Sequence, residues 1–204
     1  MKIFIPALVL CMLTLSPSAL VHANVGDKEF SNSKKISTFS LTDQNGNSFT
    51  LKQLQGHWSL IYIGYTSCPD ICPMTLANLA AVSKELNKLA GVDLAPKVIF
   101  LAVDPNRDTA HLKQYLNYFD PNYIGISGDK HEIDTLVRSL DAFYRITKKS
   151  PDDKDYEVSH SSTVYIINPD AELFGQINPP FNPQTTAQYL AALVSEGAQN
   201  DRQP

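Results

Sequence analysis

Residues 58–73, WSLIYIGYTSCPDICP, decide the fold of this chain. The first half, residues 58–65, is almost continuously apolar, as expected of a β-strand that is buried on both faces of a sheet. The second half carries two cysteines, and Pro73 suits the first turn of a helix, where its missing N–H is no loss. We therefore expect a buried strand that passes into a helix, with the cysteines at the junction.

Buried strands and amphipathic helices alternate after this stretch. The apolar spacing predicts helices over residues 73–91, 109–119 and 129–140, strands over 97–103 and 123–127, and a charged loop over 147–158. Hairpins are expected near both ends, over residues 36–51 around Asn45-Gly46 and over residues 163–177. Asn182 and Pro183 predict the start of a last helix. This order predicts an α/β sandwich of three layers with a mixed central sheet and an N-terminal hairpin.

Helix starts are expected at two further places. Asp108 or Thr109 is expected to cap the helix over 109–119, and Asp129 with Glu132 resembles a capping box for the helix over 129–140.

The N-terminal segment differs in character from the rest. Residues 1–23 combine Lys2, an apolar run over 3–15 and the small residues Val21 and Ala23, which predicts a signal peptide or an N-terminal anchor. Residues 24–35 are polar without periodicity, so we expect a tether. Residues 36–198 then form one domain, and 43% hydrophobic with 19% charged side chains is ordinary globular composition.

The charge of the chain excludes some classes of partner. The formal net charge is −4 and no basic block is present, which argues against binding to nucleic acid. It argues equally against attachment to a membrane surface by charge alone.

Export would change the role of the cysteines. If Cys11 leaves with a signal peptide, Cys68 and Cys72 remain. A disulfide between them closes so short a loop that it would stabilise the fold little, so an inert bridge is the less favoured interpretation. N–H groups at a helix start stabilise thiolates, which are both nucleophiles and metal ligands.

Three residues separate the cysteines, where thioredoxin-type redox motifs have two. Positions i and i+4 place both sulfurs on one side of a helix start, with room for an ion between them. Soft thiolates suit Cu(I), and an added imidazole also suits Cu(II), whereas structural zinc sites need four protein ligands.

A third ligand must come from elsewhere in the chain. The candidate histidines are His57, His111, His131 and His160. His160 stands before a buried strand, in a loop that can hang over the sheet edge, and spacing alone leaves this choice open. Met74 is expected to pack or to face solvent.

Three motifs in order resemble the Sco/SenC family. They are GYTSCPDICP over 64–73, VDPNRDT over 103–109, and His160 before VYIINPD over 164–170. The resemblance covers nearly the whole chain from about residue 36, and it implies a thioredoxin-like fold. By position it makes Cys68, Cys72 and His160 the ligands of one copper ion per chain. Many members place an acidic residue before the histidine, where this chain has Ser159.

The same resemblance implies a function. A copper chaperone would deliver copper to the copper centre of cytochrome c oxidase and help to assemble it. It would be exported, in the periplasm or held at the outer face of the inner membrane. Its partner would be the copper-receiving oxidase subunit or another exported copper or thiol protein. Asp104 and Arg107 match a structural or partner-facing motif of unspecified role.

One other function, from a different class, competes with copper delivery. A thiol–disulfide oxidoreductase would use Cys68 and Cys72 as its redox-active pair and would not require His160. A calcium loop over residues 152–157 is disfavoured, because these acidic residues lack the glycine and the closing glutamate of such loops.

Overall fold

The computed structural model describes residues 28–90, 95–150 and 152–200. The predicted targeting segment 1–23, the first tether residues 24–27 and the predicted helix end at Gly91 lie outside these residues.

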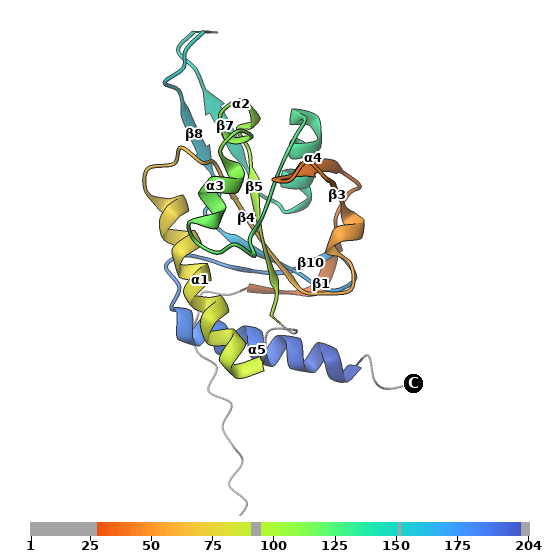
Figure 1. Ribbon diagram of the computed structural model, residues 1–204. Helices are drawn as coiled ribbons and strands as arrows, with labels where there is room; N and C mark the ends of the chain where they lie inside the picture. Colours follow the sequence, from red (N-terminus) through yellow and green to blue (C-terminus); the bar gives the residue numbers. More distant parts are fainter. Residues whose placement is uncertain (1–27, 91–94, 151, 201–204) are drawn as a thin grey trace, which may run out of the picture.

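An eight-stranded mixed sheet forms the centre of the molecule, in the order β1-β10-β9-β4-β5-β6-β2-β3 (Figure 1). Strands β4, β5 and β6 run parallel to one another, and the other pairings are antiparallel. The strands of this sheet are β1 Lys28–Lys35, β2 Ser40–Asp43, β3 Ser48–Thr50, β4 Ser59–Gly64, β5 Lys97–Ala102, β6 Ile124–Ser127, β9 Val164–Ile167 and β10 Glu172–Ile177.

A second, two-stranded sheet stands apart from the first. It consists of β7 Tyr144–Thr147 and β8 Glu157–His160, which pair antiparallel with Tyr144 opposite His160. In Figure 1 this hairpin projects beyond the body of the domain.

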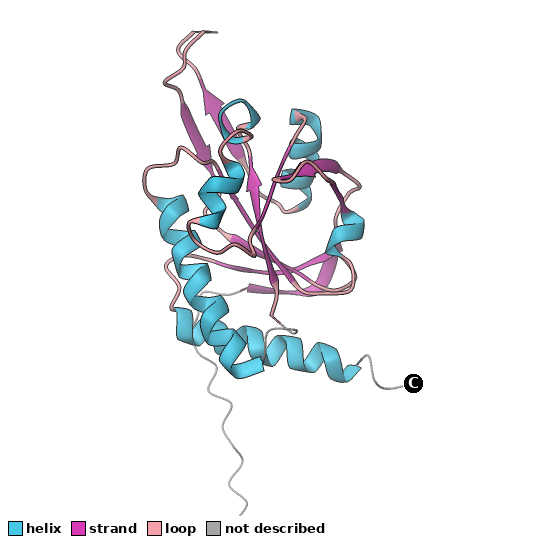
Figure 2. Cartoon of the chain, in the orientation of Figure 1, coloured by secondary structure: helices cyan, strands magenta, loops and turns pink. Residues whose placement is uncertain are grey.

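Helices cover both faces of the large sheet (Figure 2). On one face α1 Ile71–Ala90, α3 Leu112–Asn117 and α5 Pro183–Asn200 share a buried apolar core with β4 and β5. On the other face α4 Lys130–Ser139, the 3-10 helix η1 Leu51–Leu54 and the β7–β8 hairpin share a second core. Two apolar cores on either side of a mixed sheet confirm the predicted α/β sandwich.

Several local predictions are confirmed atom by atom. The first hairpin turns at Gly46, whose φ is 86°, and the Asp43 carboxylate accepts hydrogen bonds from the N–H groups of Asn45 at 2.8 Å and Asn47 at 2.9 Å. Asn182 caps α5 by accepting a hydrogen bond from the Gln184 N–H at 2.9 Å. Turn and cap residues act through their immediate neighbours, so the sequence signals them well.

The tether and the charged loop are shorter than predicted. Residues 28–35 form β1, which pairs antiparallel with β10, so the tether interpretation is wrong for them. The ends of the predicted loop 147–158 belong to β7 and β8. β1 carries a single apolar residue, Phe30, so no alternation marks it as a strand. β7 and β8 are four residues long, so the alternation of Tyr144 with Ile146 and of Tyr156 with Val158 is too short to stand out in the sequence.

Two predicted helix caps are also wrong in part. Asp108 lies within the short helix α2 Pro105–Asp108, which ends at Thr109, and α3 starts only after His111. Asp129 caps α4 by accepting from the His131 N–H at 2.8 Å, but Glu132 instead accepts from the Ser40 N–H at 2.7 Å. Because the Glu132 carboxylate is bonded to Ser40 in β2, it does not fold back to the N-terminus of α4 as a capping box requires.

None of the helices in the described part of the chain combines the length and the apolar character needed to cross a bilayer.

The burial pattern of α1 predicts unequal costs for two leucine truncations. Leu79 is fully buried, whereas 57% of Leu89 is exposed. We expect Leu79→Ala to lower the free energy of unfolding by about 2–5 kcal/mol, because it leaves a cavity. The matched Leu89→Ala should change it by less than about 0.5 kcal/mol. Urea denaturation measures both, and equal losses would contradict the assigned helix face.

Candidate metal centre

The two cysteines lie where β4 passes into α1. Cys68 is in the connecting loop, with its N–H donating to the Tyr65 carbonyl at 3.2 Å. Cys72 is in the first turn of α1, and its N–H donates to the Cys68 sulfur at 3.4 Å. The Cys68 sulfur therefore accepts a hydrogen bond from an N–H of the first turn of α1, although Cys68 itself lies before the helix. The exposed fractions are 8% for Cys68 and zero for Cys72, and the cysteines are not bonded to each other.

His160 reaches the cysteines through the pairing of β4 with β9. These strands are antiparallel with Tyr62 opposite Val164, so the end of β4 lies beside the start of β9. His160 ends β8, four residues before Val164, and its Nε2 lies 3.3 Å from the Cys72 sulfur. The donor atoms of Cys68, Cys72 and His160 all lie within 4.8 Å of one another. Two thiols and one imidazole thus converge on one point.

Neighbouring groups fix the orientation of the imidazole. Its Nδ1 lies 2.9 Å from the Ser161 carbonyl oxygen, which can only accept a hydrogen bond. Nδ1 therefore carries the proton in the neutral ring, and the lone pair of Nε2 faces the sulfurs. The rings of Tyr62 and Tyr65 pack edge-on against the imidazole, with centroid distances of 6.2 and 5.8 Å. A metal ion could replace the thiol proton without any rotation of the ring.

The two thiols have opposite acidities. Hydrogen bonding from the Cys72 thiol lowers the pKa of Cys68 to about 3, against the opposing effect of burial. The same interaction raises the pKa of Cys72, and its complete burial raises that pKa further. The metal-free pair thus holds a thiolate at Cys68 and a thiol at Cys72. Release of one proton would complete a two-thiolate site.

The absent side chain of Gly64 makes room for the inner sulfur. A Cβ at this position would lie 2.8 Å from the Cys72 sulfur and 2.6 Å from the Phe100 ring. Such contacts are too close for any other residue without movement of Cys72. In the sequence Gly64 stands out only as part of a motif, because the ring that crowds it is 36 positions away.

The other candidate ligands lie elsewhere. His111 and His131 are exposed, and so is 54% of Met74. His57 lines a separate depression with Lys97 and Asp43. Within residues 28–90, 95–150 and 152–200, Cys68, Cys72 and His160 form the one group of three or more His, Cys, Asp or Glu donors close enough to hold a metal ion.

A cavity of about 430 Å³ opens beside the three residues. Ser159, the residue directly before His160, is exposed at this cavity. The lining is mostly polar and comes from the cysteine loop, α2 and the β7–β8 hairpin, namely Tyr65, Ser67, Pro69, Arg107, Asp155, Tyr156, Glu157, Val158 and Ser159.

The acidity of Cys68 predicts how the reduced, metal-free protein reacts with iodoacetamide. The alkylation rate of Cys68 should stay nearly constant between pH 5 and pH 8, because its thiolate is already formed. An ordinary thiol, with a pKa of about 8.5, would react roughly tenfold faster per pH unit over this range. Peptide mass spectrometry localises the modification. Cys72→Ala is the control, since loss of the donor should restore the ordinary rise, and a tenfold rise per unit in the unchanged protein would contradict the assignment.

The sequence is similar to known proteins over most of its length. A SCO1/SenC family model matches residues 27–195. An SCO2-like protein of Rickettsia felis is 37% identical over 153 residues, which cover 74% of this chain and 73% of that protein. The human mitochondrial SCO1 homolog is 38% identical over 143 residues, covering 68% of this chain and 46% of the relative.

Solved structures are similar in fold. Arabidopsis thaliana ScoI with copper bound has a TM-score of 0.70 and 32% identity, with 80% of this chain and 98% of that chain covered. Bradyrhizobium japonicum ScoI with copper bound has a TM-score of 0.68 and 35% identity, with 78% and 99% covered. These similarities confirm the predicted thioredoxin-like fold. Sequence motifs, fold and family match agree, and the chain belongs to the SCO1/SenC family.

Proposed function

We propose that this protein is a copper-binding chaperone that holds one copper ion through Cys68, Cys72 and His160. It delivers copper to the copper centre of cytochrome c oxidase and helps to assemble it. The observation that carries the proposal is the convergence of two sulfurs and Nε2 within 4.8 Å. Two relatives of at least 32% identity that were solved with copper bound support the choice of metal.

The donor set favours copper over the other common metals. Two thiolates suit Cu(I), which is soft and accepts two-coordinate geometry, and the imidazole extends the site to Cu(II). A structural zinc site would need a fourth protein ligand, and the donors gathered here number three. A three-ligand site can also accept an incoming ligand, as transfer of the metal to another protein requires.

The position of the site suits hand-over to a partner. Cys72 is fully buried and Cys68 nearly so, whereas His160 is half-buried. Ser67, Pro69 and Ser159, the chain neighbours of Cys68 and His160, line the cavity beside the site. We propose that the partner is the copper-receiving oxidase subunit or another exported copper or thiol protein. We propose that the chain is exported and acts in the periplasm or at the outer face of the inner membrane. The signal-like residues 1–23 and the mitochondrial relatives support this placement.

Titration with copper tests the ligand set. The protein should bind about one Cu(I) per chain under anaerobic conditions and about one Cu(II) in air. His160→Ala should lower the affinity for Cu(II) by more than about 100-fold, since even the loss of a residue that only orients a ligand costs 10–100-fold. The affinity for Cu(I), which the two thiolates hold, should fall less. Cys72→Ser should weaken both ions.

His131→Ala is the matched control, because His131 is an exposed histidine on α4. It should bind both ions as the unchanged protein does. Retention of full Cu(II) affinity by His160→Ala, or absence of copper binding by the unchanged protein, would overturn the proposal.

A thiol–disulfide exchange role is the second candidate, favoured by the thiolate at Cys68 beside the thiol at Cys72. The third ligand separates the two functions. In an assay with an exported copper-receiving domain, His160→Ala should lose transfer of Cu(II). Reduction of an oxidised form of that domain at the full rate, without any copper transfer by the unchanged protein, would favour the exchange role.

A further inference from the structure

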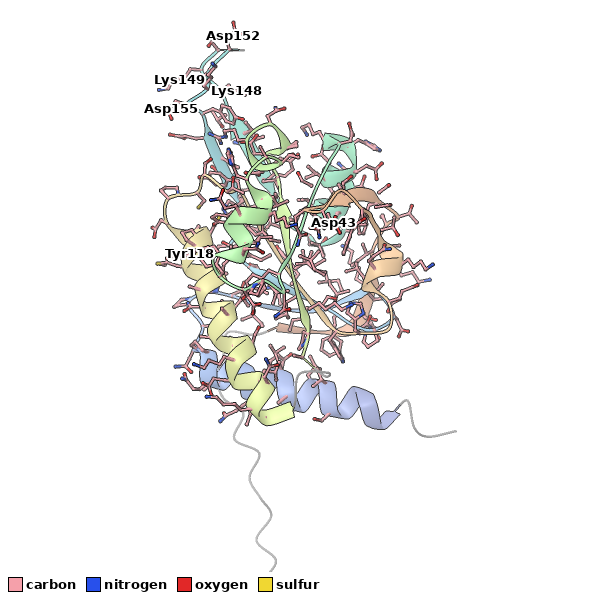
Figure 3. All side chains as sticks on the ribbon, in the orientation of Figure 1. Asp43, Tyr118, Lys148, Lys149, Asp152 and Asp155 are labelled. Atoms are coloured by element: carbon pink, nitrogen blue, oxygen red, sulfur yellow. The ribbon has the colours of Figure 1, made fainter. Side chains whose placement is uncertain are left out.

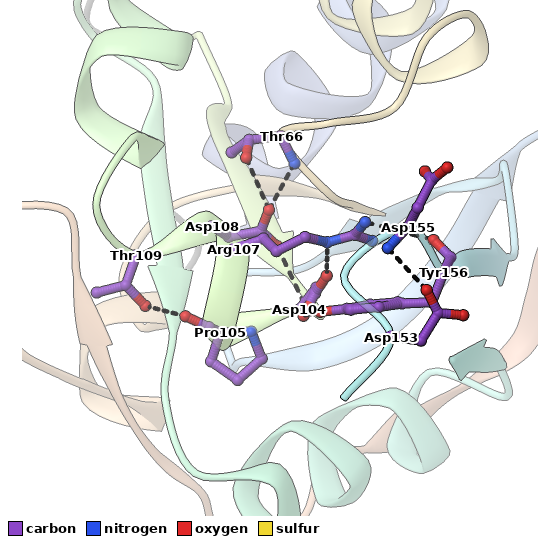
Figure 4. A network of polar contacts seen from close by, with 9 residues as sticks. All are labelled: Thr66, Asp104, Pro105, Arg107, Asp108, Thr109, Asp153, Asp155 and Tyr156. Carbon is purple, nitrogen blue, oxygen red and sulfur yellow. Dashed lines mark hydrogen bonds and ion pairs between the residues drawn. The ribbon is translucent and has the colours of Figure 1, made fainter. Parts of the chain in front are cut away.

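A buried polar network adjoins the metal centre, where β5 passes into α2 (Figure 4). Its centre is Asp104 and Asp108, whose side chains are both completely buried. The Asp104 N–H donates to Asp108 Oδ2 at 3.0 Å, so the two acids are joined. Burial of two carboxylates is costly unless each one is paired or hydrogen-bonded.

One carboxylate holds the cysteine loop. Asp108 Oδ1 accepts hydrogen bonds from the Thr66 N–H at 2.7 Å and from the Thr66 hydroxyl at 2.8 Å. Thr66 is two residues before Cys68. The path of the chain into Cys68 is therefore fixed by a buried acceptor.

The other carboxylate holds the hairpin that carries His160. Asp104 Oδ1 accepts a hydrogen bond from the Tyr156 hydroxyl at 2.8 Å, and Oδ2 pairs with Arg107 Nε. The Arg107 guanidinium lies over the Tyr156 ring, with Cζ 3.8 Å from its centroid, and Nη1 donates to the Tyr156 carbonyl at 3.3 Å. Tyr156 immediately precedes β8, which ends at His160.

These contacts matter because the hairpin lies outside the large sheet. No ladder of backbone hydrogen bonds joins β7 or β8 to the eight strands in the described residues. Apolar packing and a Tyr144–Asp134 hydrogen bond of 2.7 Å hold the hairpin against α4. The network connects the hairpin to the loop of Cys68. Its link from Tyr156 to Asp104 joins residues that are 52 positions apart.

We propose that Asp104, Arg107 and Asp108 are positioning residues that set the place of His160 relative to the cysteine pair and so strengthen the binding of Cu(II) over that of Cu(I). The inference rests on the proposed function. Both sulfurs come from one short segment, so a two-thiolate Cu(I) site depends little on the hairpin. Cu(II) needs the imidazole, so its affinity depends on the network.

Tyr156→Phe tests the arm that holds the hairpin, because it removes one hydroxyl and keeps the ring under Arg107. We expect Cu(II) to bind about 10–100-fold more weakly, as is typical when a residue that orients a metal ligand is lost. The affinity for Cu(I) should change less than about threefold. The thiolate-to-Cu(II) charge-transfer band should shift toward that of His160→Ala. In the metal-free protein, amide hydrogen exchange over residues 157–160 should accelerate while β4 stays protected.

Tyr123→Phe is the matched control. It also removes a buried tyrosine hydroxyl, which donates to the Leu76 carbonyl at 3.2 Å, but it does not touch the network. It should lower stability while leaving the Cu(II) spectrum and the preference between the ions unchanged.

Thr66→Val removes the hydroxyl that donates to Asp108, on the side of the network that holds the cysteine loop. It should also lower the affinity for Cu(II) more than that for Cu(I). Combination with Tyr156→Phe should be non-additive if both act through one network. Equal effects of Tyr156→Phe and Tyr123→Phe on Cu(II) would overturn the inference, and so would equal losses of Cu(I) and Cu(II). Absence of copper binding in the unchanged protein would instead refute the proposed function.

Discussion

The 3.3 Å contact between the Cys72 sulfur and His160 Nε2 is the interaction on which the rest of the site depends. These residues are 88 positions apart, so the whole fold must bring them together. The antiparallel pairing of β4 with β9 contributes most to this, because it places the end of β4 beside the start of β9. The hairpin β7–β8 then returns the chain so that His160, the last residue of β8, contacts Cys72 in the first turn of α1.

The contact also explains the chemistry of the metal-free pair. A fully buried thiol beside an imidazole lone pair and a sulfur acceptor keeps its proton, and its outer neighbour Cys68 takes the negative charge. The outer sulfur is thus ready for an incoming ion, and the inner sulfur loses its proton only when a metal replaces it. The room for this inner sulfur exists because residue 64 is glycine.

How well the sequence predicts each feature depends on how far apart in the sequence the interacting residues lie. The strand and helix around the cysteines, the Asn45-Gly46 hairpin and the Asn182 cap depend on neighbouring residues, and the sequence predicts them. Strand β1 carries a single apolar residue, and β7 and β8 are only four residues long, so the sequence indicates a tether and a charged loop in their place. His160 stood out among four histidines only through the family resemblance, and the link from Tyr156 to Asp104 joins segments that no local pattern connects. Lys148, Lys149, Asp152 and Asp155, at the tip of the projecting hairpin in Figure 3, belong to the part of the predicted charged loop that stays outside β7 and β8.

The proposed function requires that two sulfurs and one imidazole hold one copper ion. X-ray absorption at the copper edge, on the full chain loaded with one Cu(II), tests it most directly. We expect a first shell of two sulfur atoms and at least one imidazole nitrogen, with the nitrogen signal reduced in His160→Ala and the sulfur signal kept. A first shell of nitrogen and oxygen alone, or an unchanged nitrogen signal in His160→Ala, would contradict it.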